Sequence, residues 1–179
     1  MKKLIVLSGN SARNQAWGEG VVGYYGKYFD DVYMQYYAHW EAGEKEIDIQ
    51  QELDTLKMQA DTHTSDEEVI VFAKSIGSLL TLLSTQSKVL NPKYCIFFGM
   101  PLELAAGELF KNDWSALENF SVPSLAFHND RDPINYEYTR DALVQHNPEY
   151  IKLMSLAGDN HDYLDFEDYE NDIKTLLEL

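Results

Sequence analysis

The chain has 179 residues, of which 14 are lysine or arginine and 30 are aspartate or glutamate, so its formal net charge is −16. Such an acidic chain repels nucleic-acid phosphates and anionic lipid surfaces, and we therefore expect no nucleic acid and no membrane as partner. A hydrophobic content of 45% predicts a globular chain with a substantial core, organised as a single domain over residues 1–179.

The cysteine content and the lengths of the apolar runs bear on disulfide bonding and cellular location. Cys95 is the one cysteine, so no disulfide can form within the chain, and its apolar surroundings predict an inert core residue. No apolar run reaches the length of a membrane helix. Lys2 and Lys3 precede a short apolar run, as at the start of a signal peptide, but this run ends at residue 7 and is too short. We expect a cytoplasmic protein, and the sequence leaves the oligomeric state open.

Strands and helices are expected to alternate along the chain. Short runs rich in β-branched and aromatic residues predict strands at residues 3–7, 31–37, 69–72, 94–98, 122–128 and 150–155. Helices are expected at residues 44–60, in the leucine-rich run after Gly77, and at residues 102–120 (with a break at 112–113), 135–145 and 163–179. This alternation predicts a three-layer α/β/α fold with a mostly parallel sheet of about six strands.

A serine lies where the third expected strand meets the helix that follows it. Ser75 has Ala73 two residues before it and Gly77 two residues after it. Small neighbours let the strand and helix backbones approach closely, as in a nucleophile elbow, the sharp turn that raises a serine hydroxyl above a sheet. The same residues suit an ordinary strand–helix turn, so this stretch alone does not establish catalysis.

The loop after the first strand has two functional interpretations. Residues 8–11 could form an oxyanion loop, in which a backbone N–H of Asn10 or Ser11 faces a developing negative charge. The second interpretation is phosphate binding, because residues 18–23 match the glycine fingerprint of dinucleotide-binding domains. That fingerprint must follow its strand directly, whereas ten residues separate Leu7 from Gly18. We therefore expect these glycines to loosen a turn or to let a helix pack closely.

Further chemically active side chains follow later strands. Asp130 and Asp132 come just after the strand that ends at His128, and His161 lies in the loop before the last helix. In doubly wound sheets the functional groups lie on loops at the carboxyl ends of the strands, so we expect these residues to share one edge with Ser75. His39 and His63 fit no metal-ligand spacing and are expected at the surface, so no metal site is predicted.

The order serine, aspartate, histidine resembles that of the α/β-hydrolase superfamily. Residues 127–134 are similar to its strand-end pattern His-Gly-x-x-Asp-Pro-Ile/Val, with Asn129 in place of the glycine. Residues 156–161 are similar to its Gly-x-x-His loop, and residues 7–10 to its His-Gly-x oxyanion loop, with Ser8 in place of the histidine. The chain resembles a small, lidless esterase-like or dienelactone-hydrolase-like member, without the first two strands of the family.

The resemblance implies a role for each residue. Ser75 would be the nucleophile, His161 the general base and Asp132 the acid that orients the imidazole. We expect the Ser75 hydroxyl within hydrogen-bond reach of His161. Asp130 is the second choice for the acid, and His128 is expected to order the acid loop rather than act as the base. The N–H groups of Asn10 and Ile76 would bind the oxyanion. Ser11, Met100 and Trp114 are possible walls of the substrate pocket, although a core position suits Met100 and Trp114 at least as well.

The expected function is hydrolysis of small carboxylic esters, thioesters or related acyl compounds through an acyl-enzyme on Ser75, which needs no cofactor and no metal. Two other functions stay open. The chain could be a binding or scaffold protein with the same fold and no catalytic activity, because a fold does not fix a function. It could also be a doubly wound nucleotide-binding domain.

Overall fold

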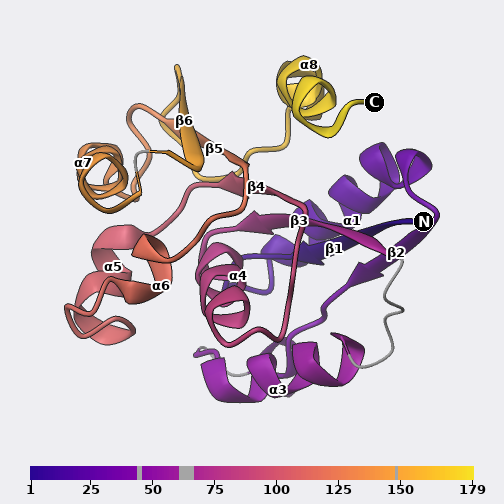
Figure 1. Ribbon diagram of the computed structural model, residues 1–179, viewed down its shortest axis with the longest axis horizontal. Coiled ribbons are helices and arrows are strands. Elements are labelled where there is room, and N and C mark those ends of the chain that lie inside the picture. The colour runs from indigo at the N-terminus through magenta and orange to yellow at the C-terminus, as the bar shows by residue number, and fades with distance from the viewer. Residues whose placement is uncertain (44–45, 61–66, 148) are drawn as a thin grey trace.

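Six parallel strands form one sheet in the computed structural model, which describes residues 1–43, 46–60, 67–147 and 149–179 (Figure 1). The strand order is β2-β1-β3-β4-β5-β6, and every neighbouring pair is parallel. The strands are β1 (Lys2–Leu7), β2 (Asp31–Met34), β3 (Glu68–Lys74), β4 (Tyr94–Phe98), β5 (Ser124–Asn129) and β6 (Ile151–Leu156). The predicted parallel sheet is confirmed.

The helices differ more from the prediction than the strands do. They are α1 (Asn14–Tyr25), α2 (Ala38–Ala42), α3 (Ile49–Ala60), α4 (Ile76–Gln86), α5 (Leu102–Glu108), α6 (Ser115–Glu118), α7 (Tyr136–His146) and α8 (Phe166–Leu177), with a 3₁₀ turn η1 (Gly26–Tyr28). Helices α1 and α2 were not predicted. The helix expected at residues 44–60 begins at Ile49, with residues 44–45 outside the described part, and the one expected at 102–120 is divided into α5 and α6.

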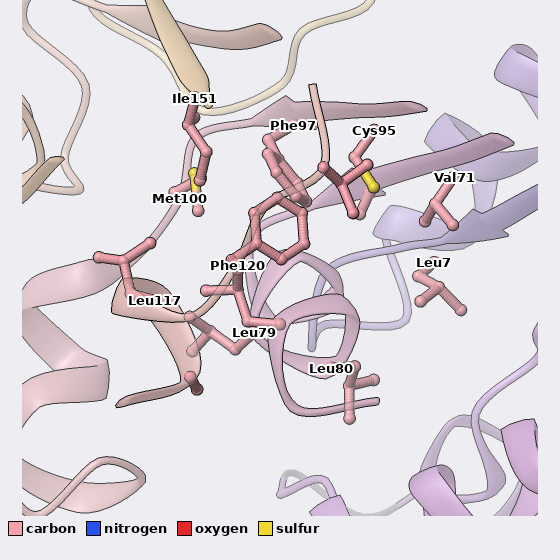
Figure 2. Packing of buried hydrophobic residues seen from close by; sticks show 14 of the residues in the cluster. Leu7, Val71, Leu79, Leu80, Cys95, Phe97, Met100, Leu117, Phe120 and Ile151 are labelled. Atoms are coloured by element: carbon pink, nitrogen blue, oxygen red, sulfur yellow. The ribbon is translucent and has the colours of Figure 1, made fainter. Parts of the chain in front are cut away.

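Alternation along the strands sends apolar side chains to both faces of the sheet. In β4, Cys95 and Phe97 belong to a core formed with α3 to α7, whereas Ile96 and Phe98 belong to a second core formed with α1 and α8. These two groups of helices lie on opposite sides of the sheet (Figure 1). Figure 2 shows the first core, which includes Leu79 of α4 and the rings of Phe97 and Phe120, whose centroids are 5.9 Å apart. In the described part of the chain, every helix is too short or too polar to cross a lipid bilayer.

Candidate active site

Ser75 occupies a strained turn between β3 and α4. Its backbone has φ 50° and ψ −121°, a combination that a non-glycine residue adopts only when its surroundings enforce it. The Ser75 N–H donates to the carbonyl of Phe98 over 2.9 Å, and the Ser75 carbonyl accepts from the N–H and hydroxyl of Ser78 over 2.9 and 2.6 Å. These bonds fix the turn through its backbone and leave the serine hydroxyl to other partners.

The small residues on either side of Ser75 meet a steric need. A side chain at Gly77 would overlap the carbonyl oxygen of Leu7, because the first turn of α4 lies against the end of β1. Ala73 is fully buried and pairs with Leu7 on one side and Phe97 on the other. The turn therefore has the close strand–helix contact of a nucleophile elbow, with alanine tolerated in the first small position.

His161 and Asp132 form a hydrogen-bonded pair on neighbouring loops. Nδ1 of His161 lies 2.8 and 3.0 Å from the two carboxylate oxygens of Asp132, whose side chain is completely buried. The hydroxyl of Tyr163 and the N–H of Ile134 also donate to this carboxylate. Burial opposes ionisation of Asp132, but the hydrogen bonds from His161, Tyr163 and Ile134 outweigh it and lower the pKa of the carboxyl below its usual value. Asp132 is therefore an anion that can hold Nδ1 of the imidazole in its protonated form.

Gly99 places the imidazole beside the serine turn. The residue follows Phe98, whose carbonyl bonds Ser75, and its φ is 55°. A Cβ at Gly99 would overlap Cε1 of His161 and lie 2.7 Å from Nδ1, so the ring rests directly on the backbone of this glycine. Ser75, Gly99 and His161 are thus consecutive neighbours along the carboxyl edge of the sheet.

Nε2 of His161 is the ring nitrogen that faces away from Asp132. It is buried and has no hydrogen-bond partner in the described part of the chain, so the hydrogen bond that we expected from Ser75 is not formed. Catalytic hydrogen bonds are commonly long in ligand-free enzymes and tighten when substrate binds. The nitrogen is available to accept a proton from a group that moves against it.

The other acids and histidines have different partners. Asp130 accepts from the N–H of Gly158 over 3.1 Å and lies 3.6 Å from the Arg131 guanidinium, so of the two aspartates it is Asp132 that contacts His161. His128 is buried, and its Nε2 lies 3.1 Å from the carbonyl of Ile134, which supports its expected role in ordering the acid loop. His39 was expected at the surface and is 5% exposed, so that prediction was wrong. His63 lies outside the described residues.

A cavity of about 450 Å³ opens beside Ser75. Asn10, Ser75 and Ile76 all line it, so the serine shares one space with both residues that were expected to bind an oxyanion. Most of the remaining wall is apolar, and it comes from Ile47, Ile49, Leu79, Pro101, Leu104 and Leu109. Glu46 adds a carboxylate. The cavity therefore offers a mostly apolar surface beside Ser75, with Glu46 as its one carboxylate among the described residues, whereas His161 and Asp132 do not line it.

Three residues that were named as possible pocket walls are not among those that line this cavity. Met100 is 1% exposed and belongs to the core in Figure 2, and its carbonyl accepts from the Thr139 hydroxyl. The Trp114 ring stacks on His146 with centroids 4.5 Å apart. Ser11 is exposed on the loop before α1. Their contribution to substrate binding stays a prediction.

The structure gives the glycine motif at residues 18–23 a packing role. These glycines lie inside α1, and a side chain at Gly18 would overlap Met34, while one at Gly20 would lie 2.8 Å from the Phe166 ring. A dinucleotide fingerprint instead opens its helix directly after a strand. In the described residues, no group of three or more His, Cys, Asp or Glu side chains could hold a metal ion.

Sequence reasoning did not identify Gly99 and Tyr163 as parts of the site. Tyr163 was assigned to the terminal helix, which begins at Phe166, and its hydroxyl bridges the N–H of Asn129 and the carboxylate of Asp132. A glycine directly after a predicted strand was the one available signal for Gly99.

Comparison with solved structures identifies the fold. Est1E from Butyrivibrio proteoclasticus, solved with ferulic acid, aligns with a TM-score of 0.74 at 13% identity, over 100% of this chain and 90% of its own. The type II thioesterase BorB from the borrelidin biosynthetic cluster aligns with a TM-score of 0.66 at 20% identity, over 99% and 91%.

An uncharacterised Bacillus cereus protein aligns with a TM-score of 0.71 at 18% identity, over 98% of this chain, which spans 60% of that protein's length. No protein-family model and no curated protein matched the sequence. Other solved structures that align over nearly the whole chain are described as an α/β-hydrolase enzyme and a serine hydrolase. The chain therefore has the α/β-hydrolase fold.

Proposed function

We propose that the protein is a serine hydrolase that cleaves small neutral esters or thioesters with an apolar acyl group. One observation carries the proposal. At one edge of the sheet, the strained turn at Ser75 and the hydrogen-bonded pair of Asp132 and His161 lie next to each other, on either side of Gly99. A serine hydroxyl is a weak nucleophile without an adjacent base, and His161 is the base that this arrangement supports.

The proposed reaction uses the donors and acceptors at this edge of the sheet. The Ser75 oxygen attacks the acyl carbon while Nε2 of His161 takes the hydroxyl proton, and the N–H groups of Ile76 and Asn10 bind the resulting oxyanion. The same proton then passes to the leaving alcohol or thiol, which departs and leaves an ester on Ser75. Water attacks this ester with His161 again as base, releasing the carboxylic acid and restoring the serine.

The cavity supports a particular acyl chemistry. A space of about 450 Å³ lies toward the small end of ligand pockets, and Ile47, Leu79 and Leu109 are among its apolar wall residues. A carboxylate moved from water into such surroundings loses hydration without gaining a partner, and Glu46 would repel it. The acyl group that fits is short to medium in length and uncharged.

This proposal predicts a preference between two esters of equal acyl length. We expect kcat/KM for p-nitrophenyl butyrate to exceed that for the mono-p-nitrophenyl ester of succinate by about tenfold or more, equivalent to about 1.4 kcal/mol of transition-state binding. The two esters share a leaving group, so initial rates of p-nitrophenolate release compare their acyl ends alone. Equal or inverted values would refute an apolar acyl site, and no turnover of any activated ester by folded protein would refute the hydrolase.

A further inference from the structure

Three side chains of one short segment bind the carbonyls of the oxyanion loop, residues 8–11. The Tyr37 hydroxyl donates to the carbonyl of Ser8 over 2.8 Å. The indole N–H of Trp40 donates to the carbonyl of Asn10 over 2.7 Å, and Nε2 of His39 lies 2.6 Å from the same oxygen. Because a carbonyl oxygen only accepts, His39 carries its proton on Nε2 here. The segment at the start of α2 therefore holds alternate peptide groups of the loop.

Lys74 reaches the same loop from the strand that leads to Ser75. Its ammonium donates to the side-chain oxygen of Asn14 over 2.5 Å, and the amide nitrogen of Asn14 donates to the carbonyl of Ser11 over 3.1 Å. A Cβ at Gly9 would lie only 2.6 Å from that amide nitrogen, so the Asn14 side chain rests directly on the loop backbone. Lys74 and the oxyanion loop are therefore joined through one intervening side chain.

The surroundings of Lys74 indicate that its charge does not stabilise the folded protein. The residue is 2% exposed, and in the described part of the chain no carboxylate lies within 4.0 Å of its ammonium. Burial lowers the pKa of Lys74 to about 8, although the charges of Asp162 and Asp132 partly oppose this. An ammonium buried against a neutral amide destabilises the folded state relative to an apolar residue of similar shape. The presence of Lys74 is therefore better explained by the groups that it positions than by a contribution to the free energy of folding.

We propose that Lys74 and Trp40 are positioning residues that clamp the Ser8–Ser11 loop from two sides and thereby preorganise its oxyanion donor. This inference rests on the proposed hydrolase function. Donors that are already fixed where negative charge develops stabilise the transition state without reorganising, so a loosened loop lowers the rate of the chemical step more than substrate affinity. The clamp connects Lys74, which directly precedes Ser75, to the Ser8–Ser11 loop.

Two variants remove one side of the clamp each while keeping most of the side-chain volume. Lys74→Met removes the ammonium, and Trp40→Phe keeps an aromatic ring but removes the N–H donor. With p-nitrophenyl butyrate we expect kcat to fall about 10- to 100-fold in each, less than the loss of a whole oxyanion donor, while KM changes less than about threefold. Lys152→Met, an exposed lysine on β6, is the matched control and should behave as the parent.

Two further measurements separate positioning from a structural role. Hydrogen exchange of the peptide covering residues 8–14 should accelerate in both variants and not in Lys152→Met. The thermal midpoint of Lys74→Met should equal or exceed that of the parent, because a buried charge has been removed; a residue needed for folding would lower it together with activity.

The outcomes distinguish the clamp from the proposed function. The clamp is refuted if the parent is active and both variants keep kcat within about twofold, or keep the parental exchange rate of the loop. The proposed hydrolase function is unaffected by that result. A loss of kcat in Lys74→Met that is matched by a lower thermal midpoint also overturns the clamp, because unfolding then explains the loss. A parent that hydrolyses no ester overturns the proposed function and with it the catalytic purpose of the clamp.

Discussion

Replacing Ser75 with alanine is expected to abolish ester hydrolysis, with a loss of kcat on the order of 10⁶-fold, as for the nucleophile of a well-studied serine protease. Alanine has no oxygen to form the acyl-enzyme. The hydrogen bonds that hold the turn involve the Ser75 backbone only. Its N–H donates to the carbonyl of Phe98, and its carbonyl accepts from Ser78, so alanine keeps both. The free energy of unfolding should therefore stay within about 0.5 kcal/mol of the parent.

The matched control for this variant is the serine at the other end of α4. Ser87 is exposed directly after the helix, where its hydroxyl donates to the carbonyl of Leu83 over 2.8 Å. Ser87→Ala should hydrolyse p-nitrophenyl butyrate at the parental rate. A Ser75→Ala protein that stays folded and matches the parent would remove this serine from the mechanism and favour a different nucleophile.

Asp132→Asn is expected to lower kcat about 10⁴-fold, the effect of the equivalent change in serine proteases. The carboxylate accepts the proton on Nδ1 of His161, which leaves Nε2 unprotonated and able to act as a base. An asparagine amide can instead donate to Nδ1, which moves the ring proton to Nε2 and blocks acceptance of a proton from Ser75. The measurement is the steady-state rate with the same ester, together with circular dichroism to show that the variant is folded.

Asp130→Asn tests the same loop without touching the imidazole. Asp130 is exposed and accepts from Gly158, so we expect its neutral variant to stay within a few-fold of the parent. A large loss in Asp130→Asn with a small loss in Asp132→Asn would show that the acid had been assigned to the wrong residue.

The sheet and the site edge could be predicted from the sequence because both depend on local patterns. Each strand is a short run of β-branched or aromatic residues, and parallel connections bring their carboxyl ends to one edge, where the structure has Ser75, Asp132 and His161. Helix α1 was missed because its three glycines are poor helix formers. Its stability comes from packing, since Gly18 allows close contact with Met34, which no local pattern reveals.

The supporting residues of the site depend on contacts that are distant in sequence. Lys74 and Asn14 meet across 60 positions, and Trp40 and Asn10 across 30. His39 was expected at the surface because it fits no metal-ligand spacing, yet it is buried and contacts the carbonyl of Asn10. Such pairings are determined by how loops pack over the sheet edge, and hydrophobic periodicity contains no information about them.

The most direct measurement is labelling of the folded protein with a fluorophosphonate, followed by peptide mapping of the modified residue. The probe phosphonylates only serines that a neighbouring base activates, and it does not require the natural substrate. We predict one adduct per chain, on the peptide that contains Ser75, with none in the Ser75→Ala variant. An adduct on another serine, or none on protein shown to be folded, would contradict the claim that Ser75 is an activated nucleophile.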